Sequence, residues 1–290
     1  MNRFLALVGA VILAFISVSS ACTAAPAQWI HFTLEPERGR DGIQANFRSE
    51  GRAGHQNNWS ADFRPGEFAG LDIAGFRGAG TRPLRFSLTR EAGRLDCSGL
   101  GGQSHAEGNC GFTPDASFLA LLDSRGIARP TDEQAFGLMA VNARRELIDA
   151  ISAARYPAPK ISDLIALAAL DVSGAYIREM AGAGYRPPNL QGLVQFKAMG
   201  ITPQWIAGFV RIGYGDLPAD QLVQLKALDI TPQFIAGFDQ VGYRHLPVDK
   251  LVQLKALDIT PDFARRVAGP GQAMPDIGKL VELRSFSERH

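Results

Sequence analysis

Hydrophobic residues recur at helical spacing through the C-terminal half of the chain, in one unit that repeats without insertion. The leading leucines of the unit are Leu164, Leu193, Leu222, Leu251 and Leu280, which gives a period of 29 residues. In each clear copy, hydrophobic residues recur every three positions after the leading leucine, with Gln and Lys between them. This pattern is typical of an amphipathic helix. A leucine-rich repeat is the alternative, but its strand core and its Asn are missing, and a Thr-Pro pair after the leucines predicts a second helix.

The second helix of each unit is expected to start at Thr-Pro and to end at Gly-Tyr. In the clearest copy, Thr231 is the expected N-cap and Pro232 the first helical residue, where a missing N–H has no effect on the hydrogen bonding. Gly242 is expected to close the helix in a left-handed conformation, with Tyr243 folded back on the last turn. One such hairpin cannot bury its apolar face alone, whereas a stack of hairpins can. The pattern predicts an α-helical repeat array over residues 130–286, with units near 135, 164, 193, 222 and 251 and a truncated unit at 280.

Residues 28–127 show strict alternation of apolar and polar positions instead. Alternation between Gly-rich turns predicts a small antiparallel sheet of five or six strands. A helix from Asp115 to Arg125 is expected to cover one face of this sheet. The predicted fold class is therefore α+β: a small antiparallel β domain with one covering helix, followed by an α-solenoid of helical hairpins with a 29-residue period. The alternating stretches are 29–34, 43–47, 59–63, 84–88, 95–97 and 110–112.

Residues 1–27 have the features of a secretory signal peptide. Arg3 supplies the positive charge, an apolar core follows, and small residues lead to a cleavage site before Gln28. The apolar run is too short to favour a membrane anchor, and no later stretch is expected to span a bilayer. The alternative is a lipoprotein at the membrane surface with Cys22 as the lipidated residue, although the preceding residues match that signal only in part. The expected location is the periplasm or the outside of the cell.

Cys97 and Cys110 are predicted to form a disulfide. They remain as an even pair in an exported chain once Cys22 is removed or lipidated. They lie on the two arms of an expected hairpin, so the bond closes a loop of about 14 residues and stabilises the fold by roughly 3 kcal/mol in the chain-entropy model. A redox or metal site is the alternative, but it would need a close Cys-x-x-Cys or additional His ligands.

Charge and motifs limit the functions that the chain could have. A formal net charge of +1 argues against a nucleic-acid binder, which is usually basic over a whole domain. The sequence has no H-E-x-x-H, no G-x-S-x-G and no phosphate-binding glycine loop, so no catalytic residue, metal ligand or cofactor is expected. The one cluster that could support hydrolysis is Asp96, His105 and Glu107, and its side chains would have to converge in a cleft.

The repeats also place polar residues in register from one unit to the next. The simpler explanation is a solvated face that duplication has copied. The alternative is a ladder on one wall of the solenoid that binds an extended or anionic partner. The residues of the predicted ladder are Gln195, Lys197, Gln224, Lys226, Gln253 and Lys255.

Three signals together resemble a known family. They are Leu95-Asp-Cys97 in the Gly-rich β segment, Arg129-Pro-Thr-Asp132, and leucine helices joined by Ile-Thr-Pro and closed by Gly-Tyr. This combination resembles the extracytoplasmic C-terminal repeat region of antirepressor metallopeptidases of the beta-lactam-sensor type, and related stand-alone exported proteins of Gram-negative bacteria. The chain lacks the transmembrane bundle and the H-E-x-x-H of that family, so no peptidase residue carries over. The resemblance implies a periplasmic sensing or interaction module without the enzyme.

The sequence therefore predicts a non-enzymatic periplasmic protein that binds a protein or peptide partner through its helical repeats. Solenoids present long surfaces that suit this role. Two alternatives stay open: a cell-envelope hydrolase with its site in the β domain, and a signalling partner of a separate membrane peptidase.

Overall fold

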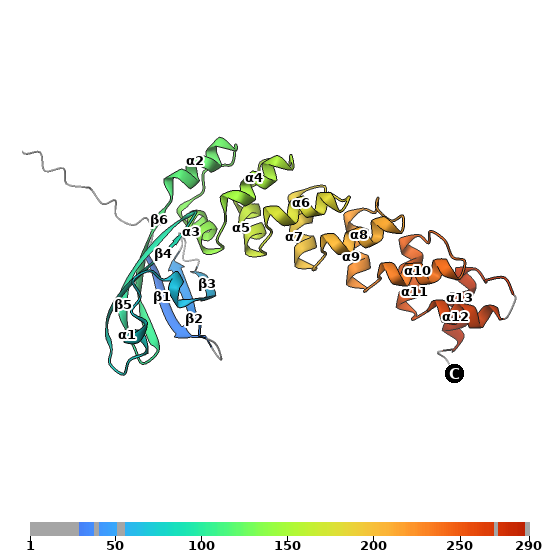
Figure 1. Ribbon diagram of the computed structural model, residues 1–290, viewed down its shortest axis with the longest axis horizontal. Coiled ribbons are helices and arrows are strands. Elements are labelled where there is room, and N and C mark those ends of the chain that lie inside the picture. Colours follow the sequence, from blue (N-terminus) through green and yellow to red (C-terminus); the bar gives the residue numbers. More distant parts are fainter. Residues whose placement is uncertain (1–28, 38–40, 51–55, 270–271, 288–290) are drawn as a thin grey trace, which may run out of the picture.

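The computed structural model describes residues 29–37, 41–50, 56–269 and 272–287. Within them, a six-stranded antiparallel sheet is followed by a series of helices, so the predicted α+β class is confirmed (Figure 1). The predicted signal peptide and Cys22 lie outside the described residues. The strands are β1 (Trp29–Pro36), β2 (Ile43–Glu50), β3 (Gln56–Phe63), β4 (Arg82–Arg90), β5 (Gly93–Gly102) and β6 (His105–Pro114).

The sheet has the strand order β3-β2-β1-β6-β5-β4 and buries one of its two faces. Alternate residues such as Phe32, Phe47 and Phe112 are almost fully buried, as expected for strands with a period of two. The connection between β3 and β4 crosses this face and carries η2 (Pro65–Glu67) and α1 (Ile73–Arg77), with Phe68 and Phe76 packed into the core. The opposite face of the sheet carries the polar residues.

The covering helix is not the predicted one. The stretch after Asp115 forms α2 (Ala116–Ser124), but α2 packs against α4 (Arg145–Ala153). Besides the short α1, the helix that contacts β5 and β6 is α3 (Asp132–Ala140), whose Phe136 ring lies 5.6 Å from that of Phe112 and 6.4 Å from that of Trp59. The prediction failed because an apolar stripe shows that a helix face is buried, but not against which element.

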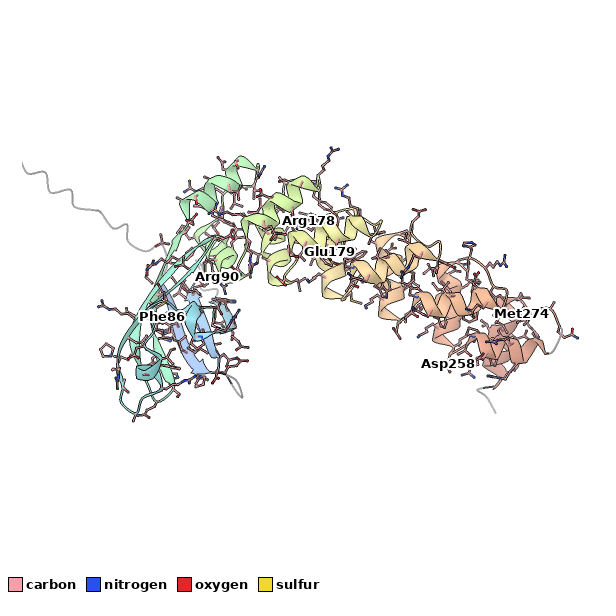
Figure 2. All side chains as sticks on the ribbon, in the orientation of Figure 1. Phe86, Arg90, Arg178, Glu179, Asp258 and Met274 are labelled. Atoms are coloured by element: carbon pink, nitrogen blue, oxygen red, sulfur yellow. A yellow bond between two sulfur atoms is a disulfide. The ribbon has the colours of Figure 1, made fainter. Side chains whose placement is uncertain are left out.

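Arg90 joins the sheet to the helices (Figure 2). Its guanidinium donates hydrogen bonds to the carbonyl oxygens of Met139 and Ala140, at the C-terminal end of α3. The same group lies 5.2 Å from the ring centroid of Trp59 and 5.4 Å from that of Phe63. Burial in this position lowers the pKa of Arg90 below its ordinary value. A cation that caps a helix end and stacks on aromatic rings fixes α3 to the sheet.

The helices predicted to start at Thr-Pro do so, and the clearest copy also ends at the predicted Gly-Tyr. Thr231 accepts a hydrogen bond from the N–H of Phe234, and Pro232 opens the helix, as predicted. Gly242 has φ +102°, and the N–H of Tyr243 donates to the carbonyl of Phe238, which closes the helix as expected. The helices after α4 are α5 (Ile161–Ala169), α6 (Gly174–Gly182), α7 (Leu190–Ala198), α8 (Pro203–Arg211), α9 (Ala219–Ala227), α10 (Pro232–Gln240), α11 (Val248–Ala256), α12 (Pro261–Ala268) and α13 (Ile277–Ser287).

Alternate helices pack side by side. Contacts join α2 to α4, α4 to α6 and α6 to α8, and a second series joins α3, α5, α7, α9, α11 and α13. Figure 1 shows the two series extending side by side from the sheet to the C-terminal end. One buried hydrophobic cluster continues from Ile30 in the sheet to Leu222 in α9, so the core passes from the sheet into the helices without a break. Among the described residues, no helix has the length and apolar character needed to cross a membrane.

Candidate interaction surfaces

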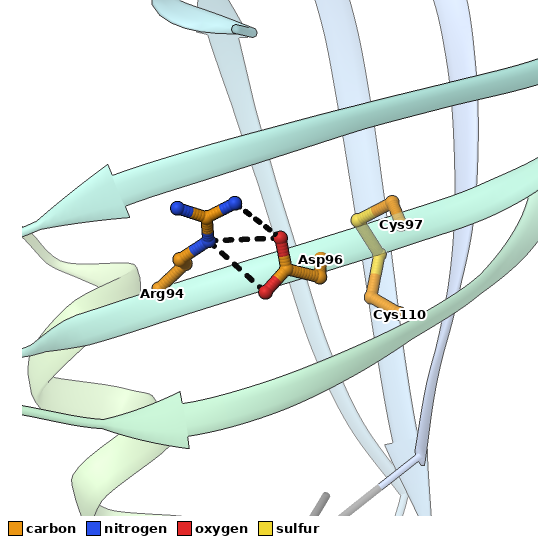
Figure 3. The surroundings of a disulfide bond; sticks show 4 residues. All are labelled: Arg94, Asp96, Cys97 and Cys110. Atoms are coloured by element: carbon orange, nitrogen blue, oxygen red, sulfur yellow. Dashed lines mark hydrogen bonds and ion pairs between the residues drawn. A yellow bond between two sulfur atoms is a disulfide. The ribbon is translucent and has the colours of Figure 1, made fainter. Parts of the chain in front are cut away.

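The structure does not bring the hydrolase candidates together. Asp96 lies on β5, where Arg94 pairs with both of its carboxylate oxygens at 2.7–3.0 Å (Figure 3). His105 lies near the tip of the β5–β6 hairpin, with its Nδ1 3.7 Å from a carboxylate oxygen of Glu35. The strand register places Asp96 and His105 six residues apart along the hairpin, about 20 Å in an extended strand. Glu107 is exposed on the same strand face as His105 and is paired in register with Leu100, four residues from Asp96, so Asp96 stays apart from the other two groups.

Cys97 and Cys110 are joined by a disulfide across β5 and β6 (Figure 3). The two residues are direct partners in the strand register, with their Cα atoms 4.0 Å apart. Their exposed fractions are 4% and 0%, because both side chains point into the apolar core. No group of three His, Cys, Asp or Glu side chains in the described ranges could hold a metal ion. Because the disulfide is buried, it is suited to hold the β5–β6 hairpin together and is poorly accessible for redox exchange.

The polar face of the sheet contains a hollow of about 380 Å³ on β1, β2 and β3. The side chains that line it pair with one another: Nε of Arg48 donates to Oδ1 of Asn58 at 3.0 Å, and Asn46 donates to the hydroxyl of Thr33 at 3.4 Å. Side-chain pairs of this kind between neighbouring strands are typical of the solvated face of a sheet.

The lysines of the predicted ladder lie over aromatic rings of the preceding helix pair. A cation in this position is attracted by the negative face of the ring. The fourth member of the row is an arginine, at the same place in α13. The pairs are Lys197 with Tyr176 (5.1 Å), Lys226 with Trp205 (5.6 Å), Lys255 with Phe234 (5.4 Å) and Arg284 with Phe263 (5.7 Å), measured to the ring centroid.

Two of these cations also cap the preceding helix of their series. Nζ of Lys255 donates to the carbonyl of Asp229 at 2.9 Å and lies 3.8 Å from its carboxylate. Arg284 does the same at α11: its Nε donates to the carbonyl of Leu257 at 2.9 Å, and a terminal guanidinium nitrogen lies 3.4 Å from the carboxylate of Asp258. Basic groups at a helix C-terminus bond its free carbonyls and complement its dipole. The lysine half of the predicted ladder is thus engaged by the protein's own helices.

The glutamines of the predicted ladder point elsewhere. Residues two apart on a helix do not share a face, so each Gln is directed away from its Lys. Gln195 and Gln224 are exposed and Gln253 is half-buried, and none has a hydrogen-bond partner within the described ranges. The exposed residues three positions further along the same face are Ala198, Ala227 and Ala256.

Tyrosines link successive helix pairs. Each of four hydroxyls donates a hydrogen bond to a backbone carbonyl 25 to 32 residues further along the chain. Burial raises the pKa of all four, that of Tyr176 to about 12. The sequence predicted how Gly-Tyr closes a helix but not these bonds to the next pair. The pairs are Tyr156 with Pro187, Tyr176 with Ile201, Tyr214 with Leu246 and Tyr243 with Pro275.

A cavity of about 60 Å³ lies where the α3–α4 connection meets the α5–α6 connection. Its lining mixes apolar and charged side chains. The residues around it are Val141, Asn142, Arg144, Glu146, Leu147, Ala168, Asp171, Val172, Ser173 and Gly174.

Comparison with known proteins gives no relative. No family model matches the chain, and neither the curated proteins nor the solved structures provide a match. The function must therefore be argued from the surfaces described above.

Proposed function

We propose that the protein is a non-enzymatic interaction module, in which helices α2–α13 form a solenoid of 29-residue units that binds an extended segment of a protein or peptide partner. The helix bounds support the repeat. Helices α5, α7, α9, α11 and α13 start at residues 161, 190, 219, 248 and 277. Helices α2, α4, α6, α8, α10 and α12 start at residues 116, 145, 174, 203, 232 and 261, and this constant step supports an array that includes α2, ahead of the expected start at residue 130.

The row of Gln195, Gln224 and Gln253 carries the proposal. Packed helices lie roughly 8–10 Å apart, and an extended chain advances about 3.3 Å per residue, so every third residue of an extended peptide matches one helix of the row. A glutamine amide both donates and accepts, as the backbone of such a peptide requires. The exposed alanines beside the glutamines leave space for a backbone to approach closely.

The charge of this face defines the partner further. Asp220 and Asp249 are exposed four residues before Gln224 and Gln253, which puts them on the same helix face. Lys250 is exposed three residues before Gln253 and offsets Asp249, so with the ladder lysines turned toward aromatic rings the glutamine face carries no excess of positive charge. The partner is thus a neutral or basic segment, not the anionic one that the lysines suggested.

Extracytoplasmic location and a signalling role stay part of the proposal. The Cys97–Cys110 disulfide is typical of oxidising compartments. The resemblance of the Thr-Pro and Gly-Tyr signals to the exported region of sensor-type peptidases supports a periplasmic partner protein. A hydrolase finds less support, because Asp96 and His105 lie about 20 Å apart along the hairpin.

Peptide selection tests the binding surface. Peptides selected from a displayed random library on the exported chain should bind in an extended conformation. The triple change Gln195→Ala, Gln224→Ala, Gln253→Ala should weaken their binding about 100-fold, because three hydrogen bonds of roughly 1 kcal/mol each are lost.

A matched control removes exposed glutamines from the other helix series. Gln204→Ala with Gln233→Ala changes residues in the first turns of α8 and α10 and should leave affinity within twofold. Equal loss in the control and in the triple variant, or selected peptides that bind as helices, would refute the role of the glutamine row.

A further inference from the structure

The row of cations over rings is interrupted at one step. Moving 29 residues back from Lys197 leads to Ala168, and moving the same distance back from Tyr176 leads to Leu147. A methyl group replaces the long cationic side chain, and a smaller aliphatic side chain replaces the ring. One further step back, Met139 and Phe118 fill the equivalent places and are fully buried.

The 60 Å³ cavity occupies this interrupted step. Both Ala168 and Leu147 line it, together with Asn142. Asn142 is the counterpart, three units earlier, of Asp229, whose carbonyl and carboxylate hold the ammonium of Lys255. One water needs roughly 10–15 Å³ of such space, so the cavity can hold several waters or the end of a flexible side chain.

The charged residues at the cavity include acceptors for an ammonium group, with two acidic and two basic side chains in all. Glu146 and Asp171 contribute two carboxylates to the lining, and Arg144 contributes one guanidinium. Outside the lining, a guanidinium nitrogen of Arg178 lies 3.6 Å from the Glu146 carboxylate. Val141 and Val172 supply apolar walls beside Leu147, where an alkyl stem would pack.

We propose that this cavity binds a primary ammonium group at the end of an unbranched alkyl chain, the chemistry of a lysine side chain on a partner. The ligand takes the place that the protein's own Lys197, Lys226 and Lys255 take at later steps. This site goes beyond the glutamine row, because Ala168 is two residues from the position that corresponds to Gln195 and so lies on another face of its helix.

Titration with a small probe tests the site directly. Nα-acetyl-L-lysine methylamide, added to about 50 mM because one side chain binds weakly, should shift the methyl NMR signals of Val141, Leu147 and Val172 saturably. Nα-acetyl-L-norleucine methylamide has the same stem without the ammonium and should bind at least tenfold more weakly. Equal binding of the two probes, or no shift at these methyls, would overturn the proposal.

Two substitutions that fill the cavity provide the second test. Ala168→Lys restores the internal row and should abolish the saturable shifts. Ala168→Met fills the cavity with an uncharged side chain, as Met139 does one unit earlier, and should also abolish the shifts. This variant keeps the test valid if the lysine variant does not fold. Ala169→Lys places an equal charge on the neighbouring exposed position and should keep affinity within twofold. Probe binding that is unchanged in both Ala168 variants would show that the cavity is not the site.

Discussion

The contact between Lys226 and Trp205 offers the sharpest test of what holds the helices together. Nζ of Lys226 lies 5.6 Å from the ring centroid, and the same ring packs on Phe209 at 4.3 Å between centroids. Both side chains are half-buried. The interaction energy should therefore lie between that of an exposed cation–π pair and that of a desolvated one, at about 1 kcal/mol. Trp205→Ala also removes ring packing, so its total effect should be larger, about 2–3 kcal/mol for a ring that is only half-buried.

A double-mutant cycle separates the two contributions. Lys226→Met keeps the alkyl stem and removes the charge, Trp205→Ala removes the ring, and the pair of changes together gives the coupling. We expect a coupling of about 1 kcal/mol in the free energy of unfolding. Hydrogen exchange of amides in α8 and α9 is the suitable measurement, because a long series of packed helices need not unfold in one step.

The control is Lys250→Met on α11, where the side chain is exposed. It should change exchange in α8 and α9 by less than about 0.5 kcal/mol, the range of an ordinary surface substitution. Coupling below about 0.3 kcal/mol would mean that the two changes are additive, and the stabilising role of the cation row would be refuted.

Three further changes probe the core, the hairpin and the tyrosines. Phe238→Ala removes a fully buried ring and should cost about 3–5 kcal/mol, with exchange rising in α9–α12 while the sheet keeps its protection; uniform loss in both would indicate one cooperative unit. Replacing Cys97 and Cys110 by Ala should lower the free energy of unfolding by roughly 3 kcal/mol in urea titrations, and an unchanged midpoint would contradict the stabilising role of the bond. The raised pKa of Tyr176, about 12 against an ordinary value near 10, predicts that its contribution is fully present below pH 10. Stability should then fall as pH rises through 12, because the unfolded chain loses the proton first; phenolate absorbance that appears in the folded protein already at pH 10 would contradict this.

The sequence by itself determined the local features of the chain. The caps at Thr231 and Gly242 involve residues within five positions of one another, so local residue types are enough to predict them. The alternation in the β segment predicted which residues enter the core, because a strand has only two faces. The disulfide followed from the number and placement of the cysteines in one hairpin.

Only the tertiary structure decided which surfaces meet. The helix that covers the sheet is α3 rather than α2, because an apolar stripe does not name its partner. The lysines lie over rings that are 21 residues earlier in the chain, a contact that requires two helix pairs to be stacked. The cavity at Ala168 lies between two helix connections that only the packing of the helices brings together. Such features depend on the packing of distant segments, and residue types within one segment do not contain that information.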